Sequence, residues 1–597
     1  MHLAQAGRLP EAVNAFRVLT QEAPHHNASQ QMLAVLLHQL GRDAEAIDAA
    51  GGALDRHPDA LPARRALVSS RLRTGDFAQA LRDADHPSLL DATAELASTL
   101  QDFAAASALH ERAALLRARA ERHPQDYQAA LALAAALHQV GRVSEAIPWC
   151  ERAHALRSHE RQPIEIRAAA LIDRGDVEAG LAAYRDLLAR GDDADTTARY
   201  LVLIHYDPEQ TNDSLFEAHR TFVQKYVPAF GPAYVPRPRD PAQPLRVGWL
   251  SPRFIAGPVP TFLTDLLRAF DRTRHRHLLI ALQTARDAST ERLRALADEW
   301  IDASGLDNEA LLQRLRALDL DVLIDLTGHA TANRIAVIAQ RAAPVQISWL
   351  DWFDTTAIPA MDAWISDVWL TPEDSKQRYT ERLIRLDAGH FCYSPHPDTP
   401  PATYDGDGDV VFASFNRLAK LNDGVVQTWA EILRRVPDAR LALAARTLGD
   451  PATRSRIEQR FAAYGIGPER LELFGHRPYV ELLAAYRRVD IALDPFPFSG
   501  GTTTCDALYM GCPVITVPGE TFVSRQTASF NWRLGRDEWV ARDRADYVER
   551  AVTAASQVAS LRAGRTQMRK DVRSRLCDVE RQAVEFAQAF RTLLGAR

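Results

Sequence analysis

The sequence predicts two architectures in one chain: an all-α solenoid of helical hairpins, followed by two α/β domains of the Rossmann type. Three observations support this prediction. A 34-residue pattern repeats early in the chain, prolines then crowd a short segment, and strand-like and helical segments alternate through the rest. At 597 residues the chain is long enough for several domains, each with its own core.

The early repeat is marked by glycines. Gly7, Gly41 and Gly75 follow one another at 34-residue intervals, and Gly141 and Gly175 resume the same interval. The surrounding text also recurs, as in GRLPEAVNAF, GRDAEAIDAA and GRVSEAIPWC. Glycine permits a tight turn between two helices, and the small residue five positions later lets them approach closely. This combination is typical of tetratricopeptide repeats.

Residues 1–200 are therefore predicted to form a tetratricopeptide solenoid. Its concave groove would suit an extended polypeptide, so we expect a protein partner there. Residues 83–123 break the spacing and contain either a degenerate repeat or a kink. A helical bridge followed by a proline-rich linker is predicted at 201–244. The linker is predicted because the six prolines between 228 and 244 exclude regular structure.

The α/β part begins where the text changes to LRVGWLSP. Residues 245–403 are predicted to form an N-terminal Rossmann-like half, with further strands at LDVLIDLTG and APVQISWL. Residues 404–575 are predicted to form a C-terminal half, with strands at VVFASF, RLALAA, RLELFG, IALDPF and PVITV. Two such units in succession indicate two parallel sheets that face a cleft. A helix at 576–597 is expected to pack back across both halves.

The composition argues against several classes of protein. A formal net charge of −6 and a pI near 6.4, without a dense basic run, argue against a nucleic-acid-binding protein. No run of 18 apolar residues predicts a membrane span, and the first residues lack the pattern of a signal peptide. The five cysteines are scattered, without the spacing of a metal site. We expect a cytoplasmic protein.

The segment SGGTTTCDALYMGCPVITVPGE, at 499–520, is the clearest candidate site. It joins a buried strand to a helix through two glycines and the hydroxyls of Thr502, Thr503 and Thr504. Free backbone N–H groups and the helix dipole at such a position favour a phosphate, and open α/β sheets bind ligands on this edge. The alternative is an ordinary threonine cap in a strand-to-helix loop.

The segment FNRLAKLN places two cations at the mouth of the second half. Arg417 and Lys420 follow the strand VVFASF, where a cation can face the oxygens of a diphosphate held by the threonine loop. The alternative is a pair of solvated charges at a helix start. Asp506, in the helix that follows the threonines, is placed to accept a hydrogen bond from a ribose hydroxyl. The alternative is a structural carboxylate.

Other loops supply weaker candidates. His329 and Arg334 follow the strand LDVLIDLTG, and we expect His329 to face the cleft as a catalytic group, although a lone histidine is more often structural. Glu520 stands at a second strand-to-helix entrance. The run DGDGD, at 405–409, lacks the glycine position of a calcium loop, so we predict a turn and no metal.

Together these segments resemble one family, the O-linked GlcNAc transferases and their SPINDLY-type relatives. LTGHATANR, RAAPVQISWL, FNRLAKLN and GGTTTCDALYMGCPVITVPGETFVSR are all similar to family text. The resemblance implies a GT-B fold and metal-free, cofactor-free transfer of a sugar, with inversion, from a nucleotide to Ser or Thr of proteins. By matching motif, Lys420 is the diphosphate-binding lysine, Thr502 and Thr503 bind phosphate, and Asp506 binds ribose. His205 and His219 correspond more loosely to histidines of the bridging region.

The chain departs from the family's pattern in the sugar half of the site. Arg253 and Gly257 stand where the family usually has Asp and His, Asp351 stands where it has Gly, and Arg417 stands where it has Gln. The diphosphate half is thus retained while the sugar half is changed. The residues expected to form the sugar pocket are Gly257, Pro258, Leu350, Asp351 and Phe498.

Two functional hypotheses follow. The first is a protein O-glycosyltransferase that uses a UDP- or GDP-sugar and holds its acceptor protein in the tetratricopeptide groove. The second is a catalytically inactive, nucleotide-binding scaffold, which the replacements at Arg253 and Gly257 favour. The retained Lys420 and threonine loop favour the enzyme.

Overall fold

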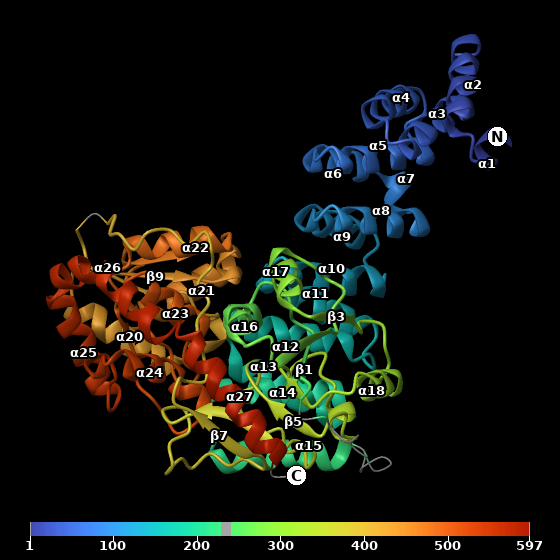
Figure 1. Ribbon diagram of the computed structural model, residues 1–597. Helices are drawn as coiled ribbons and strands as arrows, with labels where there is room; N and C mark the ends of the chain where they lie inside the picture. The colour runs from blue at the N-terminus through green and yellow to red at the C-terminus, as the bar shows by residue number, and fades with distance from the viewer. Residues whose placement is uncertain (1, 228–233, 235–239, 241, 407, 596–597) are drawn as a thin grey trace. The chain divides into compact units, whose positions relative to one another are not determined.

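The structure, a computed structural model, describes residues 2–227, 234, 240, 242–406 and 408–595 (Figure 1). The chain divides into two compact units, Met1–Leu171 and Ile172–Arg597. The sequence placed this boundary at 200 instead. The difference arises because Leu181 and Leu201 pack in one core with Leu278 of the first α/β sheet. Most of the proline-rich linker predicted before residue 244 falls outside the described residues.

The first unit is built of helical hairpins, as the repeat predicts. At the turns, Gly7, Gly41, Gly75 and Gly141 have φ values of 73°, 74°, 81° and 83°, a region that few other residues adopt. The predicted small residues, among them Ala46, are at most 1% exposed between the paired helices. The helices are α1 His2–Gln5, α2 Leu9–Glu22, α3 Asn27–Gln39, α4 Asp43–Arg56, α5 Leu61–Arg73, α6 Phe77–Ala84, α7 Pro87–Leu90, α8 Thr93–Ala105, α9 Leu109–Arg122, α10 Tyr127–Gln139, α11 Val143–Leu156 and α12 Gln162–Arg174, which crosses into the second unit.

The irregular segment 83–123 contains one complete hairpin preceded by a short extra helix. Helices α8 and α9 match the lengths of the pairs α3–α4 and α10–α11, and α7 is inserted before them. Ser107 occupies the turn with a φ of 58°, in the left-handed region that glycine occupies in the other turns. The sequence pattern was lost here because a serine replaces the glycine, while the hairpin was retained.

Replacing Ser107 by glycine should stabilise the first unit. A left-handed conformation costs a non-glycine residue about 1–2 kcal/mol, which glycine avoids. The greater flexibility of glycine in the unfolded chain reduces this gain in stability by about 0.5–1 kcal/mol. We expect a net gain of roughly 0.5–1 kcal/mol in the free energy of unfolding, measured by urea denaturation. Ser107→Ala, which keeps a Cβ, is the control and should give no gain; an equal gain in both variants would contradict the turn argument.

In the second unit, helices lead into a seven-stranded parallel sheet. Its order is β3-β2-β1-β4-β5-β6-β7, and the chain direction across the sheet reverses between β1 and β4. The sequence predicted β1, β4 and β5 and missed the other four strands. The elements are α13 Val177–Arg190, α14 Ala194–Leu203, η1 Ile204–Tyr206, α15 Asn212–Tyr226, β1 Leu245–Ser251, α16 Pro258–Ala269, β2 His275–Ala281, α17 Ala288–Leu296, β3 Glu299–Asp302, α18 Asn308–Ala317, β4 Val322–Asp325, α19 Ile335–Ile338, β5 Val345–Ser348, β6 Ala363–Asp367 and β7 Arg382–Leu386.

A second parallel sheet follows, with all five of its strands where the sequence predicted them. Its order is β10-β9-β8-β11-β12, so the reversal lies between β8 and β11. Ligands of open α/β sheets bind beyond the carboxyl ends of the strands at such a reversal. The elements are β8 Val411–Ser414, η2 Leu418–Lys420, α20 Asp423–Arg435, β9 Arg440–Ala444, η3 Arg446–Gly449, α21 Pro451–Ala462, η4 Pro468–Arg470, β10 Leu471–Phe474, α22 Tyr479–Ala485, η5 Tyr486–Arg488, β11 Ile491–Leu493, α23 Thr502–Tyr509 and β12 Val514–Ile515.

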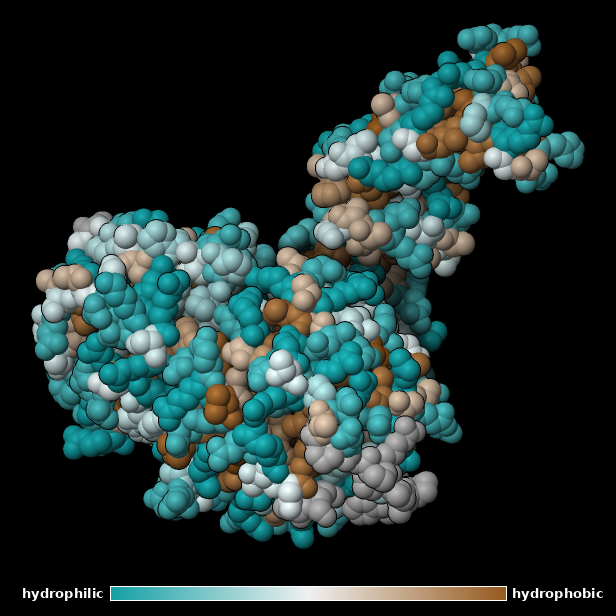
Figure 2. All heavy atoms as spheres, viewed as in Figure 1, coloured by the Kyte–Doolittle hydropathy of each residue, from teal (hydrophilic) through white to brown (hydrophobic). Residues whose placement is uncertain are grey.

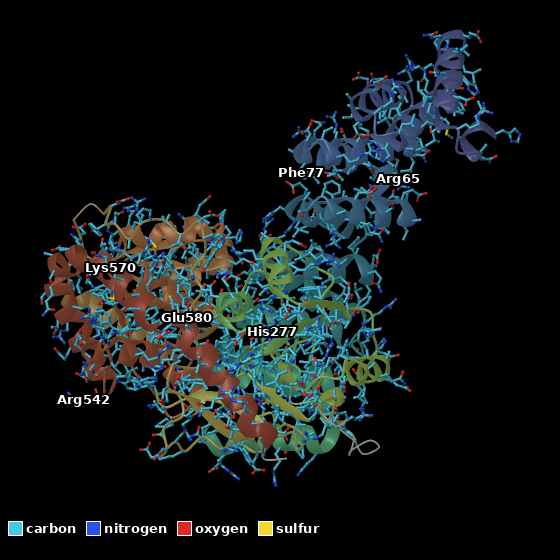
Figure 3. All side chains as sticks on the ribbon, in the orientation of Figure 1. Arg65, Phe77, His277, Arg542, Lys570 and Glu580 are labelled. Atoms are coloured by element: carbon cyan, nitrogen blue, oxygen red, sulfur yellow. The ribbon has the colours of Figure 1, made fainter. Side chains whose placement is uncertain are left out.

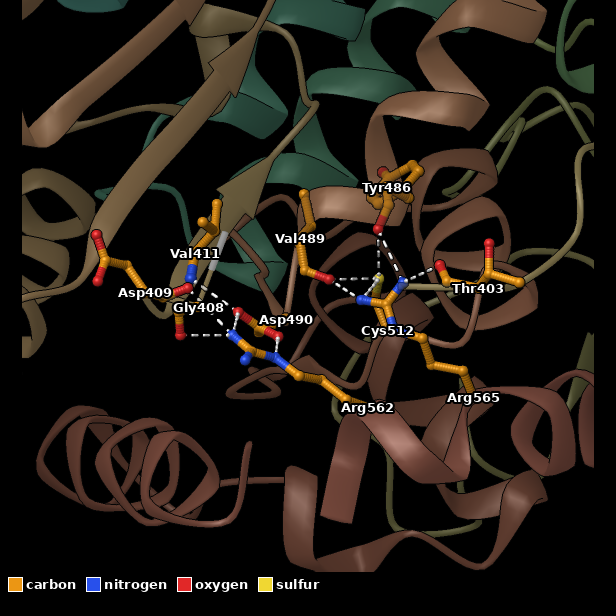
Figure 4. Close-up of polar contacts among 10 residues, drawn as sticks. All are labelled: Thr403, Gly408, Asp409, Val411, Tyr486, Val489, Asp490, Cys512, Arg562 and Arg565. Carbon is orange, nitrogen blue, oxygen red and sulfur yellow. Dashed lines mark hydrogen bonds and ion pairs between the residues drawn. The ribbon is translucent and has the colours of Figure 1, made fainter. Parts of the chain in front are cut away.

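The C-terminal helices connect the two α/β halves. They are α24 Phe522–Leu534, η6 Asp537–Trp539, α25 Arg544–Ser556, α26 Val558–Arg575 and α27 Val579–Gly595. Helix α26 packs on α23, α24 and α25 of the second half, and α27 packs on α16, β5 and β7 of the first. From α26, Arg562 pairs with the buried Asp490, and Arg565 donates to the carbonyls of Tyr486 and Val489 (Figure 4). The two halves are thus contacted by two different helices, α26 and α27, whereas the sequence predicted that the last helix alone would pack across both.

The described helices include none with the length and apolar character that a membrane crossing requires. Hydrophilic side chains cover most of the second unit on the face shown in Figure 2.

Candidate functional site

The threonine loop lies at the reversal of the second sheet, between β11 and α23. Gly500 and Thr504 stabilise the loop itself. The N–H of Gly500 donates to Asp494 Oδ1 at 2.6 Å, and a Cβ at position 500 would lie 2.3 Å from Thr504 Oγ1. Thr504 is buried and shares a 2.8 Å hydrogen bond with Thr527. Thr502 and Thr503 are half-buried, so these two hydroxyls, at the start of α23, are the ones a phosphate could reach.

Lys420 lies opposite this loop, on the other side of the reversal. Its Nζ donates to the Ser499 carbonyl at 2.7 Å and lies 3.3 Å from Asn416 Oδ1, which also accepts from Thr503 Oγ1 at 3.1 Å. Burial lowers the pKa of Lys420, and the carboxylate of Asp494 opposes that effect. The ammonium is therefore held between the two loops by polar partners, without a direct ion pair to a carboxylate in the contacts described.

Two cavities lie at this edge and share part of their lining. The smaller, about 430 Å³, lies at the carboxyl ends of β8, β9 and β10 and includes Asn416 and Arg417. The larger, about 1010 Å³, is lined by Thr502 from the second half and by Gly257 and Pro258 from the first. Both include His476, Arg477 and Leu482. Together they offer the volume of a nucleotide-sized ligand, with one half of the molecule on each side.

Arg417 is placed differently from Lys420. Its side chain is 60% exposed, and its Nη2 donates to Asp173 Oδ1 at 2.7 Å. It borders the smaller cavity while remaining paired to this carboxylate, which Arg446 also approaches at 3.5 Å. The charge of Arg417 is therefore partly neutralised by Asp173, whereas Lys420 has no carboxylate partner in the contacts described.

Asp506 is buried under two tyrosines. The hydroxyls of Tyr393 and Tyr479 both donate to its Oδ1 at 2.7 Å, and burial raises the pKa of Asp506 to about 6. Tyr479 and Thr502, one turn before Asp506, line the larger cavity. The predicted contact of Asp506 with a ribose remains a prediction; the structure shows that Oδ1 is occupied by the two tyrosines.

Asp351, which the sequence predicted in the sugar pocket, forms an ion pair. Arg253 Nη1 lies 2.9 Å from Asp351 Oδ2, so two of the four residues that depart from the family's pattern contact each other. Burial raises the pKa of Asp351 to about 6, and Arg253 opposes that effect. Leu350, just before, has a φ of 81°, a strained conformation for a bulky residue. Phe498 lies beneath Lys420, with Nζ 4.6 Å from the ring centre.

The remaining candidates are not in the lining of either cavity, and neither are Lys420, Asp351 and Phe498. His329 is fully buried, and its Nε2 bonds the Thr356 carbonyl at 2.8 Å, so it does not face the cleft as expected. Arg334 donates to the Leu306 carbonyl at 3.3 Å, and the exposed Glu520 pairs with Lys376 at 3.3 Å. His205 and His219 are buried beside His329, where desolvation lowers the pKa of all three imidazoles.

The sequence analysis missed several residues of this region. Asn416 lies two residues after β8 and Arg477 three residues after β10, so the rule that ligands bind beyond strand ends could have found them. No pattern could pair Tyr393 with Asp506, because they belong to different halves of the unit.

Two parallel α/β sheets on either side of a cavity, with a cation and a hydroxyl-bearing helix start at one reversal, define the GT-B class of fold. The chain belongs to glycosyl transferase family 41, which matches residues 230–396 and 402–586. The predicted fold class, solenoid followed by GT-B, is confirmed by a solved structure: a mutant O-GlcNAc transferase of Thermobaculum terrenum is 32% identical, has a TM-score of 0.77, and is matched over 81% of this chain and 94% of that one.

Plant proteins are also similar. The probable UDP-N-acetylglucosamine–peptide N-acetylglucosaminyltransferase SPINDLY of Solanum lycopersicum is 33% identical over 392 residues, which are 63% of this chain and 42% of the relative. The protein of the same name from Arabidopsis thaliana is 32% identical over 408 residues, which are 66% and 44%. The chain therefore spans less than half the length of these relatives.

Proposed function

We propose that the protein transfers a sugar from a nucleoside diphosphate donor, UDP- or GDP-linked, to Ser or Thr hydroxyls of other proteins. The observation that carries the proposal is Lys420, whose ammonium is held across the sheet reversal from Thr502 and Thr503. Membership of the glycosyl transferase family and the likeness to a structure named as an O-GlcNAc transferase support it. The solenoid supplies a groove for the acceptor, and we place the reaction in the cytoplasm.

In this proposal the acceptor hydroxyl oxygen attacks the anomeric carbon, the bond from that carbon to the diphosphate oxygen breaks with inversion, and the hydroxyl proton is released to solvent. Negative charge grows on the departing diphosphate. The Lys420 ammonium and the N–H groups at the start of α23 are already oriented, so they stabilise that charge without reorganisation. A metal ion is not required at the diphosphate, because these groups supply the positive charge. Positioning of the two substrates in the cavity supplies the rest.

Mass spectrometry of acceptor proteins co-expressed with the full chain tests the proposal. The expected result is a sugar added to Ser or Thr, and purified protein that binds UDP or GDP. Absence of modification with each common UDP- and GDP-sugar, together with retained nucleotide binding, would instead support the inactive scaffold. Absence of both would overturn the proposal.

Nucleotide affinity should depend on pH through Lys420. Because burial lowers its pKa below the ordinary value, the ammonium is present at neutral pH and is lost as pH rises through the lowered pKa. The dissociation constants of UDP and GDP should therefore rise between about pH 7 and 9, measured by calorimetry. Asp494 and Arg417 are the charged groups that act on Lys420.

Lys420→Arg is the matched control for this titration. Arginine stays charged throughout this range, so the affinity of that variant, although weaker, should vary little. Equal pH dependence in both proteins would show that another group, or the nucleotide itself, titrates.

A further inference from the structure

Three buried side chains outside the lining of the two cavities form a cluster of the kind that binds metal ions. They are His205 on η1, His219 on α15 and Asp354 in the loop after β5, and each is at most 3% exposed. One ring nitrogen of each histidine and one carboxylate oxygen of Asp354 all lie within 4.8 Å of one another. Nε2 of His205 is 3.8 Å from Asp354 Oδ2. No other group of three such residues occurs in the part of the chain that the structure describes.

The atoms that face one another in this cluster have no hydrogen-bond partner in the structure. Nδ1 of His219 bonds the Leu215 carbonyl at 2.7 Å, so this nitrogen carries the proton and Nε2 keeps a free lone pair. Asp354 Oδ1 accepts from the N–H of Thr355 at 2.7 Å, while Oδ2 is unpartnered. Neither ring nitrogen of His205 has a partner. Unpaired polar atoms in a buried site cost about 1–3 kcal/mol each, so the cluster calls for a further ligand.

The orientation of the ligand atoms is fixed by their surroundings. The other ring nitrogen of a metal-bound histidine is usually bonded to a carbonyl or carboxylate, as that of His219 is here. The loop that carries Asp354 is held by Glu381, which accepts from Thr355 Oγ1 at 2.7 Å and from the N–H of Thr356 at 2.6 Å. Aromatic rings enclose the cluster: Phe353 lies 4.7 Å from the His205 ring.

We propose that His205, His219 and Asp354 bind one divalent transition metal ion, of which Zn²⁺ fits the ligand set best. Two imidazoles and a carboxylate are ligands of tetrahedral zinc at about 2.0–2.2 Å, with a water at the fourth position. Ligand atoms in such a site lie roughly 3.4 Å apart. The ligand atoms, which lie within 4.8 Å of one another here, would therefore come about 1 Å closer on binding.

The ion would connect the bridging helices to the first α/β half, on the side that supports Lys420. Phe353, next to Asp354, lies 5.3 Å from the Phe498 ring, and Phe498 in turn lies beneath the Lys420 ammonium. Tyr206, next to His205, stacks on Phe498 at 4.7 Å. Metal binding would therefore fix both residues that hold Phe498. The inference is independent of the proposed transfer reaction, since the ion lies outside the two cavities.

The test measures metal content in the full chain expressed without a histidine tag. After gel filtration, inductively coupled plasma mass spectrometry should find about one zinc ion per chain in the wild type. His205→Gln and Asp354→Asn, which keep side-chain size, should each retain less than about one tenth of that. Zinc added to the metal-free wild type should raise its Tm by several degrees and should leave Asp354→Asn unchanged.

His277→Gln is the matched control. His277, on β2 and labelled in Figure 3, is equally buried and also has an unpartnered Nε2, but it is outside the cluster. This variant should keep the full metal content. Wild-type protein that remains metal-free after incubation with Zn²⁺ would overturn the proposal and leave a buried water as the bridging group. Metal retained in both cluster variants would also overturn it.

A second measurement applies if the cluster variants do not fold. Metal-free wild type titrated with Co²⁺ should gain the visible absorption of a four-coordinate cobalt site, saturating at about one ion per chain and removed by zinc. If this absorption does not appear during the titration, the assignment is contradicted, and no variant is needed for that conclusion.

Discussion

Lys420→Ala should slow sugar transfer on the order of a hundredfold to a thousandfold. Removing one preorganised group from a developing negative charge costs about 2–4 kcal/mol of transition-state stabilisation. Nζ of Lys420 bonds only neutral oxygens of Ser499 and Asn416 in the contacts described, so its charge is available to a diphosphate. The loss should appear in kcat/KM for the donor, measured with acceptor in excess, while circular dichroism stays that of the wild type.

Two variants separate this effect from a general loss of charge. Lys570→Ala removes an exposed lysine of α26, labelled in Figure 3, and should leave transfer unchanged. Lys420→Arg should not restore the rate, because a planar guanidinium does not fit a site shaped for a compact ammonium. Wild-type rates in Lys420→Ala would remove the residue from the proposed chemistry and weaken the assignment of the cavity.

Arg562→Ala should lower the free energy of unfolding of the second unit by about 3 kcal/mol, or more. The side chain of Asp490 is 0% exposed, and Arg562 contacts both of its carboxylate oxygens, at 2.7 Å and 3.0 Å (Figure 4). Removing one partner of a buried pair leaves an uncompensated buried charge, which costs about 3–5 kcal/mol. Urea denaturation, followed with a probe for each compact unit, measures the loss.

The control is Arg542→Ala. Arg542 pairs with Asp546 at 3.1 Å, but its side chain is 82% exposed, so its removal should cost less than about 1 kcal/mol. The double replacement Arg562→Leu with Asp490→Asn should recover part of the lost stability, because no buried charge remains. Equal losses in the two single variants would show that burial of Asp490 does not set the cost.

Much of the fold could be predicted from the sequence because it is encoded locally. The turn glycines of the solenoid require a backbone conformation that few other residues adopt, so their period is visible in the text. The five strands of the second sheet are short apolar runs between turns, and each was found. Lys420 and Thr502–Thr504 could be placed near one another because parallel strands bring their carboxyl ends to one edge.

Local patterns failed where tertiary contacts decide the outcome. Ser107 takes a glycine's conformation because the neighbouring helices impose the turn, and β2, β3, β6 and β7 form because neighbouring strands pair with them. His329, expected at the cleft, is instead covered by aromatic rings.

The sequence by itself determined the solenoid and the succession of two α/β halves, since each depends on residues close together in the chain. Only the tertiary structure decided which side chains from distant segments contact each other around the candidate site. Tyr393 with Asp506, Arg253 with Asp351, and His205 with Asp354 each join segments far apart in sequence. Such contacts depend on how whole elements pack, and packing is set by the complete core rather than by any local pattern.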